Sequence, residues 1–304
     1  MILVCGSAED RVTGFFCKRL DALGSKYQLV DLSCYPTGYR LSQRRGGLSL
    51  GSISSPSGSI RTPELTGVFV RDLSRWDDWP DARLDPDLSV ALHAERTLGL
   101  ESFWAELDCV VVNPFTSNWS NQSKPYQTLI IGNGLFEIPK TLITNDARAA
   151  RRFHEQMRGR IIYKSSSGRS FGTRAVDSEA LSRLLLTRDT PVQLQARVPG
   201  VDIRVHVVRD QIFATRIHSE AIDYRWAENE PTRLETCSLP ASVRCECIRI
   251  AEQFGLLFSG IDLRETSRGR YYCFEVNPAP DFAFYEERTG QEISAALRDL
   301  LSRG

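Results

Sequence analysis

Tyr271-Tyr-Cys-Phe-Glu-Val-Asn-Pro278, close to the end of a chain of 304 residues, is the most informative segment of this sequence. Successive side chains of a β-strand point to opposite faces, so Glu275 and Asn277 would share one face and Phe274 and Val276 the other. The segment therefore predicts a strand with one polar and one apolar face.

A second strand of the same kind, Gly260-Ile-Asp-Leu-Arg264, precedes it, and a turn-like Ser-Arg-Gly segment lies between them. If the two strands pair as a hairpin, Asp262, Glu275 and Asn277 converge on one face. Two carboxylates and one amide form an oxygen-only ligand set of the kind that Mg²⁺ prefers, together with phosphate oxygens and water. The alternative, which the sequence leaves open, is a solvated polar sheet face whose carboxylates pair with arginines.

The segment Asp202-Ile-Arg-Val-His-Val207 predicts another strand with a polar face, formed by Asp202, Arg204 and His206. Arg204 would present a permanently charged, planar donor group to a phosphate, and Asp202 would accept a hydrogen bond from a ribose hydroxyl. Arg216, on the strand that follows, is a second candidate phosphate ligand. For His206 we expect a structural hydrogen bond rather than a catalytic role.

Lys164 ends the strand Arg160-Ile-Ile-Tyr-Lys164, and a run rich in Ser and Gly, residues 165–173, follows it directly. A lysine there can contact phosphates as a point charge, and backbone N–H groups of the run, which contains Ser167 and Gly168, can lie over them. We expect the run to be mobile without nucleotide and ordered with it, because Ser and Gly lower the barrier to closure. The run does not match GxxxxGK[ST], so a P-loop is not supported.

Composition narrows the classes of partner. Lys plus Arg and Asp plus Glu both number 38, so the formal net charge is zero and gives no reason to expect nucleic acid or a membrane surface. No apolar run approaches the roughly 20 residues of a membrane span, and the N-terminal Met-Ile-Leu-Val-Cys is typical of a first strand rather than a signal peptide. Eight scattered cysteines without a CxxC pair favour reduced thiols and a cytoplasmic location.

Strand and helix patterns divide the chain into three parts. Residues 1–112 alternate between the two patterns, which indicates an N-terminal α/β domain that Asn113-Pro114 ends. Residues 113–191 and the strand-rich residues 192–304 form two further parts. Pro199-Gly200 predicts a hairpin-like turn between the strands on either side of it.

Taken together, these segments resemble the ATP-grasp superfamily. Their order is a lysine, a second lysine with a Gly/Ser run, a connecting segment, Asp-Ile-Arg, and then Asp and Glu-x-Asn on late strands. Phe274-Glu-Val-Asn-Pro278 is the most specific string, supported by Pro139-Lys-Thr-Leu-Ile-Thr-Asn145 and Phe284-Tyr-Glu-Glu-Arg-Thr-Gly-Gln291. Within the superfamily the chain is similar to the branch that contains the ribosomal-protein glutamate ligase and the graspetide (microviridin-type) peptide synthetases. The resemblance covers residues 110–300, and residues 1–110 match only loosely.

The resemblance implies a three-lobed α/β architecture, with ATP between a central lobe, residues 113–191, and a C-terminal lobe, residues 192–304. It also implies a role for individual residues. Lys124, Lys164, Ser167 and Gly168 would contact nucleotide phosphates; Gln195, Ala196, Arg197 and Val198 would line adenine through backbone groups; Asp202 would hold the ribose; Arg204 and Arg216 would hold the γ-phosphate and acyl phosphate; and Asp262, Glu275 and Asn277 would hold Mg²⁺. Two positions depart from the family pattern, since Ala196 stands where Glu is frequent and Ser165 where Pro is common.

The reaction that the resemblance implies is the ATP-dependent joining of a carboxylate to an amine or hydroxyl through an acyl phosphate. Two Mg²⁺ ions are expected, with Mn²⁺ as a substitute. The substrate would be a ribosomally made peptide modified through Asp or Glu side chains. A ligase for amino acids or other small molecules and a non-catalytic nucleotide-binding protein are the alternatives. A homodimer is also left open.

Overall fold

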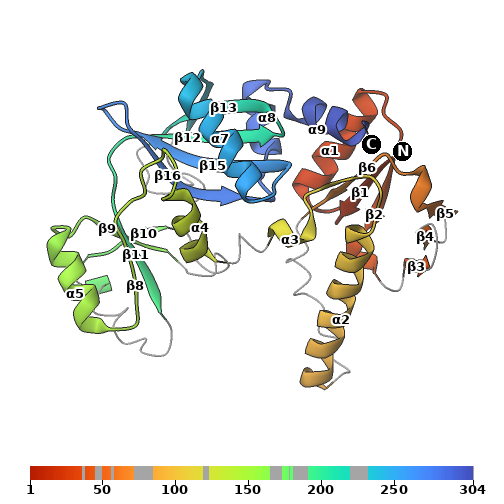
Figure 1. Cartoon of the computed structure of the whole chain (residues 1–304), viewed down its shortest axis with the longest axis horizontal. Coiled ribbons are helices and arrows are strands. Elements are labelled where there is room, and N and C mark those ends of the chain that lie inside the picture. Colours follow the sequence, from red (N-terminus) through yellow and green to blue (C-terminus); the bar gives the residue numbers. More distant parts are fainter. Residues whose placement is uncertain are drawn as a thin grey trace. The chain divides into compact units, whose positions relative to one another are not determined.

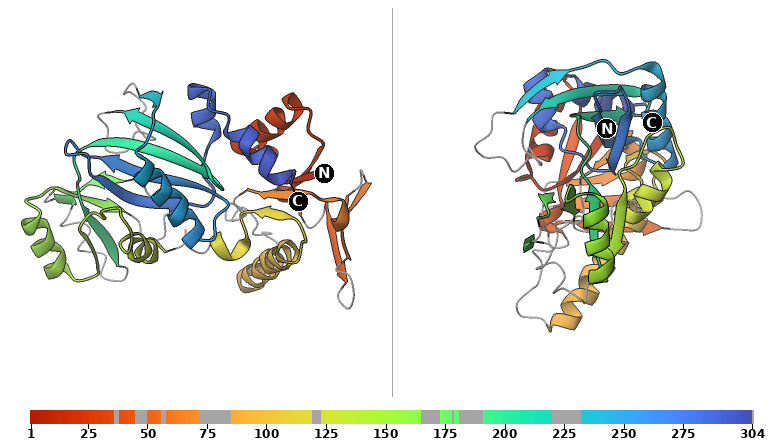
Figure 2. Two further views of the ribbon diagram at one scale, coloured as in Figure 1. Left: turned by 45° about the horizontal axis from the view of Figure 1, so that its top comes forward. Right: turned by 90° about the vertical axis from the view of Figure 1, so that its left-hand side faces the viewer.

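The computed structural model mixes helices and strands throughout, as the predicted α/β class requires (Figures 1 and 2). The described residues are 1–35, 38–44, 50–55, 58–71, 85–118, 123–164, 173–177, 179–180, 191–219 and 232–303. The chain forms two compact units, the first made of Met1–Ser117, Gly255–Phe258 and Ala279–Gly304 and the second of Asn118–Phe254 and Ser259–Pro278. The three-part division at residues 112 and 191 stays a prediction.

A four-stranded parallel sheet lies at the centre of the first unit, in the order β2-β1-β6-β7. Its strands are β1 (Ile2–Gly6), β2 (Tyr27–Asp31), β6 (Gly67–Val70) and β7 (Val110–Val112). Parallel sheets are covered on both faces, and the apolar run of β1 suits that position because the whole strand is buried. A separate antiparallel sheet contains β3 (Arg40–Arg44), β4 (Leu50–Ser55) and β5 (Gly58–Arg61).

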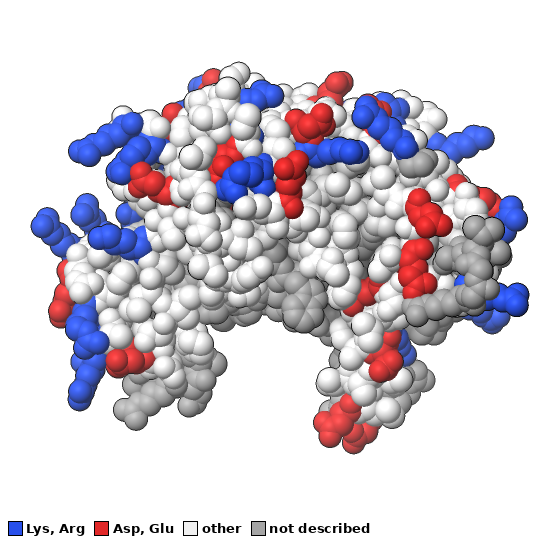
Figure 3. Space-filling view, in the orientation of Figure 1, with Lys and Arg blue, Asp and Glu red and all other residues white. Residues whose placement is uncertain are grey.

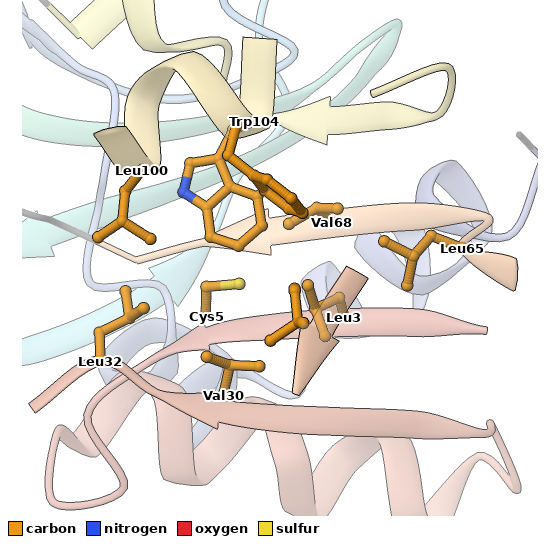
Figure 4. Close-up of a cluster of buried hydrophobic side chains, with 10 residues drawn as sticks. Leu3, Cys5, Val30, Leu32, Leu65, Val68, Leu100 and Trp104 are labelled. Carbon is orange, nitrogen blue, oxygen red and sulfur yellow. The ribbon is translucent and has the colours of Figure 1, made fainter. Parts of the chain in front are cut away.

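Helices cover the two faces of the parallel sheet. On one face, α1 (Arg11–Ala22) begins at Asp10, whose carboxylate accepts from the N–H of Thr13, and Phe16 packs against Phe69. On the other face, α2 (Pro86–Ala105) contributes Trp104 to a buried cluster (Figure 4). The buried members of this cluster are Leu3, Cys5, Val30, Leu32, Ile53, Leu65, Val68, Leu100, Phe103 and Trp104. Two further helices of this unit are α8 (Ala283–Thr289) and α9 (Ile293–Leu301).

Asn113, directly after β7, is a buried polar residue with a structural task. Its side-chain Nδ2 donates to the carbonyl of Phe258 at 2.7 Å, and its Oδ1 accepts from the N–H groups of Leu257 and Phe258 at 3.0 and 2.9 Å. Buried backbone groups need such partners, because an unmade hydrogen bond costs about 1–3 kcal/mol. The residue thus ties the short segment Gly255–Phe258 to the end of the parallel sheet. α3 (Phe115–Asn118) follows it.

The second unit contains two antiparallel sheets. The five-stranded sheet has the order β14-β13-β12-β15-β16, and the other has the order β10-β9-β11-β8. The strands of the first are β12 (Val201–Val208), β13 (Gln211–His218), β14 (Arg233–Thr236), β15 (Phe258–Glu265) and β16 (Tyr271–Asn277). Those of the second are β8 (Thr141–Thr144), β9 (Ile161–Lys164), β10 (Arg174–Ala175) and β11 (Val192–Ala196).

Each of these sheets packs a helix against one face. α7 (Ala241–Gln253) packs near β12, and its buried Cys247 lies near buried Cys273 of β16. Ile203, Val205, Ile261 and Leu263 are buried, as the sequence predicts, and on β12 the intervening Arg204 and His206 are buried as well. α5 (Ala147–Gln156) packs on the four-stranded sheet through Ala150 and Phe153. Each sheet therefore has a second face available for polar side chains.

Pro199-Gly200 does not make the predicted hairpin, because the strands on either side lie in different sheets: β11 in the four-stranded one and β12 in the five-stranded one. Glycine is needed at position 200 because the backbones of Gly200 and Glu265 lie very close together. A Cβ atom on Gly200 would lie 2.3 Å from the carbonyl oxygen of Glu265. Proline and glycine mark a change of sheet here, and sequence alone does not separate that from a turn.

The acidic and basic side chains, equal in number, are distributed unevenly over the surface. Figure 3 shows acidic and basic side chains beside each other over much of this face, with basic ones gathered at the left, where α5 lies. Arg148, Arg151 and Arg152 are exposed on that helix. Among the described residues, no helix is both long enough and apolar enough to cross a membrane.

Glu246 of α7 accepts a hydrogen bond from the backbone of Leu135, in the turn that follows α4 (Lys124–Ile131). The ionised form of this carboxyl is expected to stabilise the fold. The carboxylate of Glu246 accepts from Arg249 at 2.5 and 2.7 Å and from the N–H of Leu135 at 2.8 Å. The Arg249 hydrogen bonds come first among the causes that lower the pKa of this carboxyl. Because the folded-state pKa is lowered, this stabilisation is present above the unfolded value of about 4.3 and is lost as pH falls through the folded-state pKa.

Glu246→Gln is therefore expected to lower the free energy of unfolding at neutral pH by about 1–3 kcal/mol, since it weakens a buried, charge-assisted set of hydrogen bonds. Urea denaturation between pH 7 and pH 3 measures the difference from wild type, which is expected to shrink toward the acidic end. Glu252→Gln, an exposed position on the same helix, is the matched control. A difference between Glu246→Gln and wild type that is constant over this pH range would contradict the assignment.

Candidate active site

The polar ends of β15 and β16 meet as the sequence predicts. The two strands pair antiparallel, with Asp262 opposite Glu275 and Gly260 opposite Asn277. Residues directly opposite each other share a face, with Cβ atoms about 4.5–5.5 Å apart. The register shifts next to Asp262, where Leu263 lies opposite Cys273, so Phe274 is an extra residue on β16. This bulge brings Asp262 and Glu275 into the same cross-strand pair.

Two ion pairs connect β12 to this face of β15. Arg204 Nη1 donates to Asp262 Oδ1 at 2.5 Å, and Arg264 donates in a bidentate manner to Asp202 at 2.6 and 2.7 Å. Arg204 is buried, with 5% of its surface exposed, whereas the side chain of Asp262 is 28% exposed. The guanidinium of Arg204 therefore lies beside a candidate metal ligand, inside the protein rather than on its surface.

Both predicted phosphate lysines lie next to β16. Lys124 begins α4 (Lys124–Ile131), and its Nζ lies 3.2 Å from Glu275 Oε2. Lys164 Nζ lies over the ring of Phe274, 5.1 Å from its centroid, and the guanidinium of Arg264 lies 5.4 Å from the same centroid. The four-stranded sheet that carries Lys164 thus presents this face toward β16, and cations converge on the Glu275 region from two elements.

His206 lies on the same face of β12 and is fully buried. Burial lowers its pKa well below the ordinary value, the positive charge of Arg204 lowers it further, and Asp262 opposes the shift in part. The imidazole is therefore neutral at neutral pH and adds no charge to a site that already holds several.

Arg216 is not brought together with Arg204. The register places Arg216 opposite Ile203 and Arg204 opposite Thr215, so the two arginines project to different faces of the sheet. Arg216 Nη2 donates to Glu265 Oε2 at 2.7 Å, and the hydroxyl of Tyr271 donates to Glu265 Oε1 at 3.0 Å. Burial and Glu265 raise the pKa of Tyr271 to about 12. The phosphate role of Arg216 stays a prediction that this arrangement does not support.

The expected hinge, Gln195 to Val198, uses much of its backbone within the fold. The N–H groups of Ala196 and Arg197 donate to the carbonyls of Lys140 and Arg160 at 2.8 and 2.9 Å. The carbonyl of Val198 accepts from Arg264 at 2.8 Å. These three groups are therefore not available for a purine edge in this arrangement, and the adenine role of the hinge stays a prediction.

Two buried glutamines on β11 offer acceptors instead. Gln195 Nε2 donates to Thr141 Oγ1 at 3.1 Å, and that hydroxyl donates to the carbonyl of Pro139 at 2.8 Å, which fixes the amide orientation. Within the described part of the chain, the buried Oε1 atoms of Gln195 and Gln193 have no hydrogen-bond partner. Gln193 lies opposite Lys164, on the same face as Gln195. Gln193 was not among the residues predicted from the sequence. Two polar residues at alternate positions of an otherwise apolar, buried strand are nevertheless a signal that this face of the strand lines a binding site.

Residues 165–172, which include Ser167 and Gly168, lie outside the described residues. The expected ordering of this run with nucleotide therefore concerns residues that the structure does not describe. In the described ranges, no group of three His, Cys, Asp or Glu residues is arranged to hold a metal ion. The candidate set here contains two carboxylates and the amide of Asn277. Such a set suits a hard cation that takes its remaining ligands from phosphate and water, and does not suit Zn²⁺.

The chain matches the profile of a known protein family. A family profile described as the RimK-like ATP-grasp domain matches residues 121–301. These residues include every candidate site residue, from Lys124 to Asn277, and all strands of the second unit. No curated protein sequence matches the chain.

Three solved structures are similar over nearly the full length. The macrocyclase MdnC bound with the precursor peptide MdnA, from Microcystis aeruginosa MRC, is 23% identical, with a TM-score of 0.86 and all of both chains covered. The ATP-grasp ligase PsnB, complexed with a phosphomimetic variant of a minimal precursor, Mg and ADP, is 28% identical, with a TM-score of 0.85 and coverage of 99% and 97%. A RiPP-associated ATP-grasp ligase from Chryseobacterium gregarium, in complex with ADP and a leader and core peptide, is 21% identical, with a TM-score of 0.83 and coverage of 99% and 96%.

Proposed function

We propose a function for this chain from one premise: it belongs to the family of RimK-like ATP-grasp domains, whose profile matches more than half of it. The resemblance stated from the sequence is thereby confirmed. The chain is an ATP-dependent ligase that activates a carboxylate as an acyl phosphate and joins it to an amine or a hydroxyl. Its substrate is a ribosomally made peptide, modified or cross-linked through Asp or Glu side chains.

The observation that carries this proposal is the convergence of charge around β16. Asp262 and Glu275 lie opposite each other, Arg204 pairs with the first at 2.5 Å, and Lys124 pairs with the second at 3.2 Å. Alternating cations and carboxylates in a half-buried position suit the polyphosphate of MgATP, whose negative charge needs both metal and cationic side chains. A solvated polar face, the alternative left open by the sequence, does not account for the burial of Arg204.

Asp262, Glu275 and Asn277 are the residues that would hold Mg²⁺, and bound Mg²⁺ would neutralise charge on the transferring phosphoryl group. A substrate carboxylate oxygen forms a bond to the γ-phosphorus while the bond from that phosphorus to the bridging oxygen of ADP breaks. Arg204 donates to the phosphoryl oxygens, and Lys124 holds the phosphates near Glu275. An amine or hydroxyl then attacks the acyl carbon, phosphate leaves, and the proton of the nucleophile passes to phosphate or water. No enzyme nucleophile is needed.

The buried acceptors Gln193 and Gln195 support an adenine nucleotide, because an amide oxygen can accept from the exocyclic amino group of adenine and would repel the carbonyl of guanine. Both amide oxygens are without a partner among the described residues. Peptides are the proposed substrate class because two of the similar proteins were solved with a precursor or precursor variant and the third with a leader and core peptide. We place the protein in the cytoplasm, where MgATP is present and buried thiols such as Cys247, whose pKa burial raises to about 12, stay reduced.

The test is ADP release by the purified chain with MgATP, alone and with candidate precursor peptides encoded beside its gene. A ligase is expected to release ADP in proportion to the bonds formed, and each bond removes one water from the peptide mass. Turnover with free amino acids but with no peptide would favour the small-molecule ligase instead. Tight ATP binding without ADP release under any condition would favour the non-catalytic alternative.

A further inference from the structure

Within the part of the chain that the structure describes, the edge of β16 that faces away from β15 has no neighbouring strand, and its backbone forms hydrogen bonds with other parts of the second unit. β15 pairs with one edge of β16, and on the other edge the backbone of Glu137 bonds to it. The N–H of Glu137 donates to the carbonyl of Tyr271, and its carbonyl accepts from the N–H of Cys273, both at 3.0 Å. This contact ends before the bulge at Phe274. The segment with the candidate metal ligands therefore needs other partners along that edge.

The side chain of Gln127 supplies them. Its Nε2 donates to the carbonyl of Val276 at 2.8 Å, and its Oε1 accepts from the N–H of Val276 at 3.1 Å. Gln127 is 2% exposed and Val276 is fully buried. One side-chain amide thus takes the place of a peptide group in a neighbouring strand and satisfies both backbone groups of a single residue.

Val276 is the residue between Glu275 and Asn277. A strand backbone that is held at Val276 fixes the direction of the side chains on either side, because neighbouring side chains depart from the same short length of backbone. The bulge next to Glu275 interrupts the ladder to β15, so Glu275, Val276 and Asn277 form a short paired segment separated from the rest of β16. Gln127 therefore holds the strand where the two candidate ligands need it most.

The helix that carries Gln127 also carries Lys124, one turn earlier. Residues three apart on a helix lie on the same face. Lys124 forms an ion pair with the carboxylate of Glu275, and Gln127 forms hydrogen bonds with the backbone of Val276. The helix α4 therefore contacts two adjacent residues of β16, one through its charge and the other through its backbone. Thr128, by contrast, donates to the carbonyl of Lys124 within the helix itself. It makes no such contact with β16 and serves as a matched position.

We propose that Gln127 is a positioning residue of the metal site: it orients Glu275 and Asn277 by clamping the backbone of Val276. This rests on the proposed function, since it presumes that these residues bind Mg²⁺ with a nucleotide. Partners that orient metal ligands from outside the ligand set are worth about 10–100-fold in metal affinity in other proteins. The same range is expected here.

The test compares Gln127→Met, which keeps length and helix propensity but loses both hydrogen bonds, with Thr128→Val. Two quantities are measured besides turnover. Hydrogen–deuterium exchange of peptides spanning residues 271–278, without metal or nucleotide, reports on the clamp itself. Titration of Mn²⁺ by electron paramagnetic resonance in the presence of ADP reports on metal affinity. Gln127→Met is expected to exchange faster in this segment and to bind Mn²⁺ at least about tenfold more weakly, with turnover recovered at high Mg²⁺. Thr128→Val is expected to match wild type.

If Gln127→Met does not fold, Gln127→Asn carries the test, because it keeps a neutral amide but is one methylene too short to make both hydrogen bonds to Val276 with the same geometry. Mn²⁺ affinity between those of wild type and a fully weakened site is then expected. A folded Gln127 variant with wild-type Mn²⁺ affinity would overturn the proposal, even if its thermal stability falls, because that is the result of a purely structural role. Wild-type protein that binds no Mn²⁺ with ADP would instead contradict the proposed function, and this is seen before any variant is compared.

Discussion

Glu275→Gln and Asn277→Ala are each expected to abolish detectable ADP formation while leaving the chain folded. Both side chains lie on the face of β16 that meets Asp262, and Glu275 is also the partner of Lys124. Replacing a carboxylate by an amide keeps the shape and removes the negative charge that balances a bound cation and Lys124. Removing the Asn277 amide takes away an oxygen ligand that no neighbour on the strand can replace, since Val276 and Pro278 offer none from a side chain.

The loss is expected to reach roughly 10²–10³-fold or more in turnover, the scale of losing a group that stabilises charge developing in the reaction. Circular dichroism and the thermal midpoint check that each variant is folded. Glu235→Gln is the matched control, because Glu235 is a half-exposed carboxylate of the same sheet that pairs with Arg233 away from β16. Near-normal ADP production by both variants would remove the metal assignment from these residues.

Arg204→Ala is expected to lower kcat by roughly 10²–10³-fold while weakening ATP binding far less. Arg204 is buried beside Asp262, so its charge cannot be replaced by solvent or by a flexible surface cation. If it donates to the γ-phosphate and to the developing acyl phosphate, its contribution is largest during phosphoryl transfer. Arg204→Lys keeps the charge but loses the planar, multiple-donor geometry, so its kcat is expected to lie between those of Arg204→Ala and wild type.

Steady-state kinetics at saturating ATP, together with ADP binding in the absence of turnover, separates this role from a structural one. If Arg204 serves only to neutralise Asp262, its loss is expected to lower stability and to leave kcat at saturating Mg²⁺ unchanged. Arg233→Ala, at a largely exposed position of β14, is the control for losing a surface arginine. Full turnover by Arg204→Ala would rule out the catalytic role and would also weaken the placement of Asp202 on the same face of β12.

The strands of the candidate site were accessible to sequence analysis because alternation within one strand decides which side chains share a face. This is why the convergence of Asp262, Glu275 and Asn277 could be expected from two short segments. The bulge at Phe274 could not, because it depends on how two strands align. The face of Arg216 could not be predicted for the same reason, because it is set by the register with β12, where Arg216 lies opposite Ile203.

Contacts between a side chain and the backbone of a residue far away in the chain also could not be predicted from the sequence. Gln127 and Val276 are separated by 149 positions, and Asn113 and Phe258 by 145, and neither pair leaves a local pattern. Pro199-Gly200 marked a real feature, a passage from one sheet to another, but composition alone gives turns and such passages the same signature. The sequence therefore predicted which polar side chains of β15 and β16 share a face better than it predicted the contacts that hold these strands in place.

The central claim is that a peptide carboxylate becomes an acyl phosphate in the site around Glu275. The most direct measurement uses a precursor peptide whose Asp and Glu carboxylates carry a heavy oxygen isotope, with MgATP and the purified chain. Mass spectrometry of the released phosphate then identifies the source of its oxygens. The expected result is one labelled oxygen in phosphate for each bond formed in the peptide, because the oxygen that attacks the γ-phosphorus leaves with it. Bond formation with unlabelled phosphate, or ADP release with no peptide modified, would contradict the account.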